Sequence, residues 1–106
     1  MPKGPVIISS ATDSEDAAYG LAAGALAARL GASAQIVGPV VGVYRWEGAV
    51  RTSREWRVEI RTTADRVPAL TIYLKENHTY PLPEIFATPI EGGSAEYLNW
   101  LVEQTR

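Results

Sequence analysis

The sequence predicts an α+β domain in which a four-stranded antiparallel sheet carries two helices on one face, with a further helix at the C-terminus. Residues Gln35–Trp46 and Val50–Thr63 are typical of two strands joined by a short turn. A strand followed by a helix precedes this hairpin, and a helix followed by a strand comes after it. The order is therefore β-α-β-β-α-β plus a terminal helix, which is the order of the ferredoxin-like sandwich.

Size and composition indicate what kind of protein carries this fold. With 106 residues the chain is expected to form a single domain, residues 1–106. A net charge of −2 argues against nucleic acid or an anionic membrane as the main partner. The absence of cysteine excludes disulfides, thiolate metal ligands and a cysteine nucleophile. No apolar run reaches about 18 residues and the N-terminus lacks a signal-peptide core, so we expect no membrane span and a cytoplasmic protein.

The first strand and helix have clear sequence signals. Val6–Ala11 is a compact apolar run and predicts a buried strand. A capping box follows, with Thr12 or Asp13 expected as the N-cap of an alanine-rich helix. This helix is predicted to run to Leu30, with Gly31 at the C′ position that favours glycine.

The central hairpin is the longest regular feature. Its first strand contains Gly38-Pro39, and a proline within a strand indicates an edge or a bulge. In the second strand Trp56, Val58 and Ile60 share one face because side chains alternate. The other face carries charges of alternating sign: Glu55, Arg57, Glu59 and Arg61. We expect so long a hairpin to project beyond a small body and to leave strand edges that favour an oligomer.

The second half of the chain begins with a predicted helix capped by Asp65 and carrying Pro68 in its first turn. Its inward face is expected to hold Val67, Leu70 and Leu74, with Tyr73 as a further candidate.

A rigid corner follows at Asn77–Ile90, which holds three prolines and the single histidine. A strand is expected from Glu84 to Ile90. Ser94 should cap a last helix, Ala95–Gln104, with packing residues Tyr97, Leu98, Trp100 and Leu101.

Four segments resemble the CutA divalent-cation-tolerance proteins, in the same order and over essentially the whole chain. They are Tyr44–Gly48, Glu55–Thr63, His78–Glu84 and Tyr97–Leu101. The resemblance implies a ferredoxin-like homotrimer, similar in assembly to PII signalling proteins. It also implies a role in tolerance of copper and other divalent cations, and no enzymatic activity.

The chain departs from this family at positions that bear on metal binding. Relatives often carry cysteine where this chain has Ser9 and Ser33, and some carry it at the position of Tyr73. A thiolate copper site is therefore absent, and serine hydroxyls are poor ligands for soft metals.

His78 and Glu84 are the candidate metal ligands. A histidine and a carboxylate from one chain cannot complete a site, but three copies could bring several together around a divalent cation such as copper. The alternative for His78 is a residue at a helix C-terminus that hydrogen-bonds the free carbonyls there. The alternative for Glu84 is a structural bond to backbone N–H groups or to an arginine across a subunit boundary.

Tyr44, Trp46, Glu55 and Tyr80 are predicted to line a ligand cleft between subunits. The alternative is that the aromatic residues, Trp56 included, are buried at the hairpin base and between subunits.

Three functions remain open. The first is a PII-like binding or signalling trimer that responds to divalent cations. The second is a structural trimer that anchors other proteins without binding metal. The third, an enzyme that uses His78 as acid or base, lacks a visible nucleophile, and we expect no catalytic residue.

Overall fold

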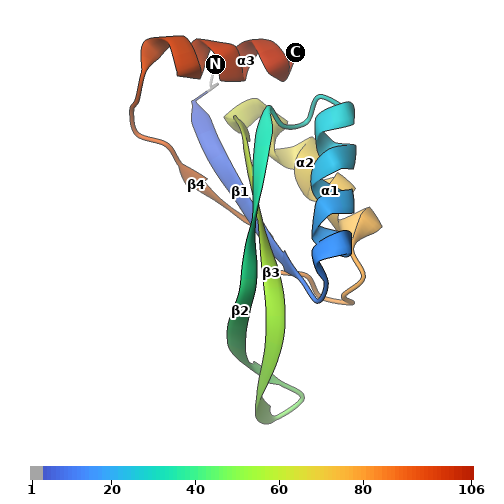
Figure 1. The fold of residues 1–106 in the computed structure, drawn as a ribbon. Helices are drawn as coiled ribbons and strands as arrows, with labels where there is room; N and C mark the ends of the chain where they lie inside the picture. Colours follow the sequence, from blue (N-terminus) through green and yellow to red (C-terminus); the bar gives the residue numbers. More distant parts are fainter. Residues whose placement is uncertain (1–3) are drawn as a thin grey trace.

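The structure, a computed structural model, describes residues 4–106 and has the predicted order of elements (Figure 1). The first three residues, part of the N-terminal segment in which no signal peptide is expected, lie outside the described residues. The elements are β1 Pro5–Thr12, α1 Glu15–Ala27, β2 Ser33–Trp46, β3 Ala49–Thr63, the 3₁₀ turn η1 Ala64–Arg66, α2 Val67–Asn77, β4 Phe86–Pro89 and α3 Ala95–Gln104.

Within the described residues the strands form one four-stranded antiparallel sheet in the order β2-β3-β1-β4. Helices α1 and α2 cover one face of this sheet, and α3 lies across the end near the start of β1 (Figure 1). The β2–β3 hairpin continues well past the other end (Figure 1), which gives the molecule extents of 44 × 25 × 22 Å. The predicted fold class is confirmed.

The hydrophobic core lies between the sheet and helices α1 and α2. Val58 and Ile60 on β3 are at most 1% exposed, and Trp56 packs against the same cluster, as the alternation in β3 predicts. The opposite, partly exposed face carries Glu55, Arg57, Glu59 and Arg61. The buried cluster comprises Ile8, Ala18, Leu21, Ala22, Ala25, Val58, Ile60, Leu70 and Leu74.

Helix α1 begins later than predicted. Its N-cap is Ser14, whose Oγ accepts a hydrogen bond from the Ala17 N–H at 3.0 Å. The prediction of Thr12 or Asp13 is wrong because β1 continues through Thr12, whose hydroxyl instead donates to the Ser14 carbonyl at 2.7 Å.

The C-terminal end of α1 also differs from the prediction. Arg29, not Gly31, has the left-handed conformation, with φ of 59°. The Leu30 N–H bonds the Ala25 carbonyl at 2.9 Å, the long hydrogen bond of a Schellman cap. Gly31 has a packing role, because a Cβ there would overlap the Ile60 side chain.

The predicted irregularity in β2 is confirmed. The register with β3 shifts between Val37 and Val40, on either side of Gly38-Pro39. β2 is an edge strand, which is where a proline within a sheet is tolerated. The hairpin turn is also confirmed, since Glu47 and Gly48 both have positive φ and connect the pair Trp46 and Ala49.

Two boundaries in the second half are corrected. Asp65 is not the N-cap of α2: it lies in η1, and α2 begins at Val67 with Pro68 in its first turn. Asp65 instead accepts hydrogen bonds from Thr63 and Arg106. β4 is shorter than the predicted strand Glu84–Ile90 because only Phe86–Pro89 pair with β1.

Helix α3 has the predicted cap and only part of the predicted packing. The Ser94 Oγ accepts from the Tyr97 N–H at 3.2 Å. Leu101 is fully buried, whereas Tyr97 and Trp100 are 41% and 39% exposed and stack on each other with ring centroids 5.7 Å apart. These two rings therefore face outward, a position that a helical repeat alone does not fix.

Candidate functional site: a groove at the base of the hairpin

A groove of about 930 Å³ lies where the projecting hairpin leaves the body of the molecule. β2 and β3 form one wall, the loop after α2 forms another, and the end of β1 closes it. Five of the six predicted site residues line this groove: Tyr44, Trp46, Glu55, Tyr80 and Glu84. His78 does not.

The Tyr80 hydroxyl and the Glu55 carboxylate form the central contact of the groove. Tyr80 Oη donates to Glu55 Oε2 at 3.1 Å. Burial raises the pKa of the Tyr80 phenol, and the nearby negative charge of Glu55 raises this pKa further. The phenol therefore stays protonated and keeps its role as donor to the carboxylate.

Gly42 makes room for this contact. It pairs with Ser53 across the hairpin, and a Cβ at Gly42 would overlap the Glu55 carboxylate. Sequence reasoning missed Gly42. A glycine inside a strand indicates a close approach, and that signal was present in Gln35–Trp46.

His78 is held by two hydrogen bonds at the C-terminus of α2. Its Nε2 lies 2.8 Å from the carbonyl of Ala11, and its Nδ1 accepts the Tyr80 N–H at 3.0 Å. A backbone carbonyl can only accept, so Nε2 carries the proton and the ring is neutral. Both nitrogens are occupied, which leaves no lone pair for a metal ion in this conformation.

The alternative prediction for His78, a residue at the C-terminus of a helix that hydrogen-bonds the free carbonyls there, is only partly confirmed. The residue does cap the end of α2, but the carbonyl it binds belongs to β1 and not to the helix. His78 therefore connects the corner after α2 to the end of β1 at Ala11, and it positions Tyr80 directly.

Glu84 is paired with an arginine of the same chain. Its Oε2 lies 3.5 Å from Nη1 of Arg57, which also lies 3.6 Å from Glu59. The Glu84 side chain is 48% exposed, so this pair is a weak surface ion pair that another ligand can displace. His78 and Glu84 share no contact, and residues 4–106 contain no group of three or more potential His, Cys, Asp or Glu ligands around one point.

The aromatic residues divide between the two faces of the hairpin. Tyr44 and Trp46 line the groove and are 42% and 37% exposed. Trp56 lies on the opposite face of β3 and packs against the core. The predicted aromatic cleft therefore has two members from this hairpin, and Trp56 follows the alternative interpretation.

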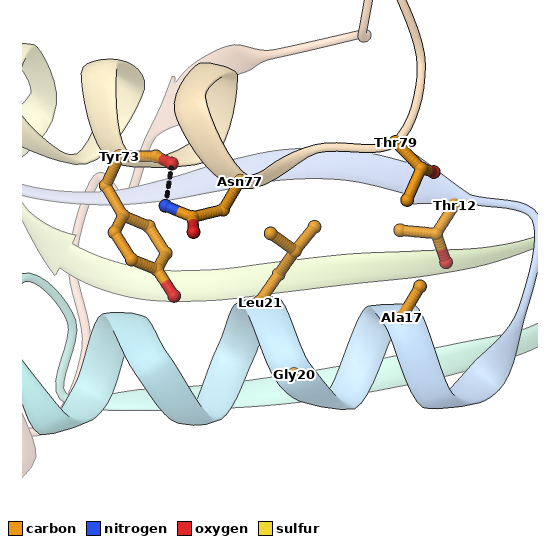
Figure 2. Close-up of a pocket in the computed structure, with 7 residues that line it drawn as sticks. All are labelled: Thr12, Ala17, Gly20, Leu21, Tyr73, Asn77 and Thr79. Atoms are coloured by element: carbon orange, nitrogen blue, oxygen red, sulfur yellow. Dashed lines mark hydrogen bonds between the residues drawn. The ribbon is translucent and has the colours of Figure 1, made fainter.

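A second, smaller cavity of about 260 Å³ lies between α1 and α2 (Figure 2). Asn77 Nδ2 donates to the Tyr73 carbonyl at its edge, at 2.9 Å, and the Tyr73 ring points toward α1 (Figure 2). None of the predicted site residues lines it. Its lining is Thr12, Ala17, Gly20, Leu21, Tyr73, Asn77 and Thr79, which includes no charged group, so the larger groove is the better candidate site.

The fold defines a class: a ferredoxin-like sandwich whose extended hairpin forms one wall of a groove. Comparison with known proteins agrees. A match to the family described as CutA1 divalent ion tolerance protein covers residues 6–104. The chain belongs to this family.

Individual relatives support the assignment. The divalent-cation tolerance protein CutA of Thermus thermophilus is 39% identical over 92 residues, 87% of this chain and 89% of that protein. The crystal structure of CutA1 from Oryza sativa superposes with a TM-score of 0.95 at 35% identity, covering 99% of this chain and 96% of the other. The Thermus thermophilus CutA1 structure gives a TM-score of 0.93 at 35% identity, covering 96% and 99%.

Two chloroplastic plant relatives are longer proteins. The chain spans 57% of the Oryza sativa protein and 56% of the Arabidopsis thaliana protein, at 37% and 35% identity. Since these relatives are named as chloroplastic, the cytoplasmic location stays a prediction. None of the helices in residues 4–106 is long and apolar enough to cross a membrane.

Proposed function

We propose that the chain is a homotrimeric, PII-like binding module in the response to divalent cations, and that its ligand binds in the groove at the base of the hairpin. The observation that carries this proposal is the groove itself. It has the volume of a small-molecule site, and it brings together five residues chosen from the sequence alone.

The trimer is supported by apolar surface that a single chain leaves open. Hairpin residues expose large side chains: Val41, Val43, Tyr44, Trp46 and Val50. β2 and β4 are both free edges of the described sheet. Exposed apolar side chains on an unpaired edge favour pairing with another chain, so further copies of this chain would cover the hairpin and complete the groove.

The donor atoms limit which cation could bind. Cysteine is absent and the His78 nitrogens are occupied, so the ligands available in the groove are carboxylate and hydroxyl oxygens. Oxygen donors suit harder divalent ions better than copper. A site for copper would need the His78 corner to rearrange, whereas a harder ion could use Glu84 after it leaves Arg57.

Calorimetric titration with Cu²⁺, Zn²⁺ and Mg²⁺ tests this proposal. We expect saturable binding that weakens at least about tenfold in Glu84→Gln, because a charged ligand group is lost. Glu76→Gln, which removes the same charge on the outer side of α2, should leave the affinity unchanged. Absence of saturable binding for all three ions, or equal affinity in both variants, would reject the metal-binding part.

The alternative is a structural trimer that anchors other proteins. The same exposed hairpin residues favour it, since they can contact a partner as well as another copy. Light scattering combined with the titrations separates the two functions: a trimer that binds no divalent cation would support the structural role. A monomer would contradict both.

The proposal does not include catalysis. Acid–base catalysis by His78 would require a ring nitrogen free to exchange a proton, and both are bonded to the backbone. Among residues 4–106 no serine hydroxyl is bonded to His78 as a nucleophile would be.

A further inference from the structure

Two carboxylates that line the groove, those of Asp13 and Glu55, form no ion pair within residues 4–106. Tyr44 and Tyr80 line the same groove. Among residues 4–106 neither Asp13 nor Glu55 lies within 4.0 Å of a lysine or arginine nitrogen, whereas Glu84 at the rim is paired with Arg57. Asp13 and Glu55 both line the groove beside Tyr80, whose hydroxyl bonds the Glu55 carboxylate.

The position of Glu55 is built into the hairpin. Its carboxylate lies over Gly42, where any other residue would exclude it, and it is held by the Tyr80 hydroxyl. An ionised carboxylate accepts several hydrogen bonds and Tyr80 supplies one. The remaining acceptor sites are available for a donor in the groove.

A second observation at this point also indicates a missing partner. Ser53 Oγ exposes less than 1 Å² and has no hydrogen-bond partner within residues 4–106. Ser53 lines the groove and lies two residues before Glu55, on the same face of β3. A buried hydroxyl without a partner is costly, and a ligand with several donors would satisfy it.

Apolar side chains form much of the remaining lining, which also includes Arg45, Arg57 and Glu84. The apolar walls include Val40, Pro81, Leu82 and Pro83 with the rings of Tyr44 and Trp46. Leu82 is 71% exposed, so this surface lacks a cover in the single chain. Aromatic faces next to carboxylates attract organic cations, since the ring quadrupole and the carboxylate both favour positive charge.

From these observations we propose that the groove binds a small organic cation, a primary amine with an apolar body, whose ammonium group lies between Glu55 and Asp13. The ammonium donates to the Glu55 carboxylate and to Ser53, and the apolar body lies along Tyr44 and the proline-rich loop. A bare metal ion fits this part of the groove less well, because it would leave the apolar walls uncovered. This inference rests on the proposed assignment of the groove as the ligand site.

Phenethylamine and phenethyl alcohol are matched probes for this inference, since they share a body and differ in the ammonium group. Both are titrated calorimetrically into the full chain in a buffer with EDTA, so that divalent cations play no part. We expect saturable binding of the amine and at least about tenfold weaker binding of the alcohol, the factor for loss of one charged hydrogen bond.

Variants locate the site. Glu55→Gln keeps an acceptor for Tyr80 and removes the charge, so it should lower the affinity for the amine about tenfold and leave the affinity for the alcohol unchanged. Asp13→Asn, at an exposed position, should also lower the affinity for the amine. Glu76→Gln is the matched charge control and should leave the affinities for the amine and the alcohol unchanged.

Three results would overturn the inference: no saturable amine binding, equal affinity for amine and alcohol, or undiminished amine binding in Glu55→Gln. Failure here is distinct from failure of the proposed function. Divalent-cation binding that depends on Glu84, without amine binding, would leave the proposed function intact and reject the amine inference. Amine binding without any divalent-cation binding would support the amine inference and reject the metal-binding part of the proposed function.

Discussion

Gly20 and Gly24 lie one turn apart in α1, yet the structure gives them opposite roles. A Cβ at Gly20 meets nothing within 4 Å, whereas a Cβ at Gly24 would overlap the Tyr73 hydroxyl. Figure 2 shows the Tyr73 ring reaching from α2 toward α1. Glycine in a helix interior is about 1 kcal/mol less favourable than alanine, so the same substitution should have different signs at the two positions.

Gly20→Ala should raise the free energy of unfolding by about 1 kcal/mol, because only the helix propensity changes. Gly24→Ala gains the same propensity but forces Tyr73 to move, and overpacking typically costs about 1–3 kcal/mol. We therefore expect Gly24→Ala to be neutral or up to about 2 kcal/mol destabilising, a difference of about 1–3 kcal/mol between the two variants.

Urea unfolding followed by circular dichroism measures both free energies. Tyr73→Phe is the matched background, because it removes the hydroxyl that meets Gly24 and this hydroxyl has no hydrogen-bond partner within residues 4–106. In Tyr73→Phe, Gly24→Ala should become less destabilising. If Gly24→Ala is as stabilising as Gly20→Ala in the unaltered chain, Tyr73 does not pack on Gly24 and the reasoning is refuted.

Three further predictions concern other contacts. Arg29→Gly should stabilise the chain by about 1 kcal/mol because Arg29 has positive φ, while Arg29→Ala should not, and thermal unfolding compares the two. In the folded chain the pKa of Asp65 is lowered well below its usual 3.8, chiefly by the hydrogen bond from Arg106. The Asp65 carboxylate therefore stabilises the fold fully at pH values above 3.8, the pKa in the unfolded chain, and this stabilisation is lost as the pH falls through the lower pKa of the folded chain. Asp65→Asn should therefore lower stability at neutral pH and reduce its loss on acidification, and an unchanged pH profile of the urea midpoint would contradict this. Gly42→Ala should displace Glu55 and break its bond to Tyr80, which lowers the pKa of that phenol, and spectrophotometric titration of tyrosine would show one group ionising at lower pH than in the unaltered chain.

Much of the fold could be predicted because its signals are local. Period-two alternation in Val50–Thr63 identified both the strand and its buried face, and Gly38-Pro39 indicated the bulge. Ser94 followed by a helical repeat gave the last N-cap. These features depend on residues within a few positions of one another, so neighbouring residues are enough to define them.

Local signals failed to place two helix caps, because contacts with distant residues decided which residue takes each role. Gly31 was the natural residue for positive φ at the end of α1, but Ile60 requires a glycine at that position and Arg29 takes the left-handed conformation instead. Asp65 resembled an N-cap, but its carboxylate is bonded to the C-terminal Arg106, 41 residues away.

The sequence by itself determined the order of the elements, the buried face of the hairpin and five of the residues that line the groove. Only the tertiary structure decided what those residues do. His78 could have been a free ligand, but the Ala11 carbonyl, 67 positions away, occupies its Nε2, and Tyr80 reaches Glu55 across 25 positions. Hydrogen bonds between such distant residues depend on how β1, the hairpin and the loop after α2 pack together, and no local pattern in the chain contains that information.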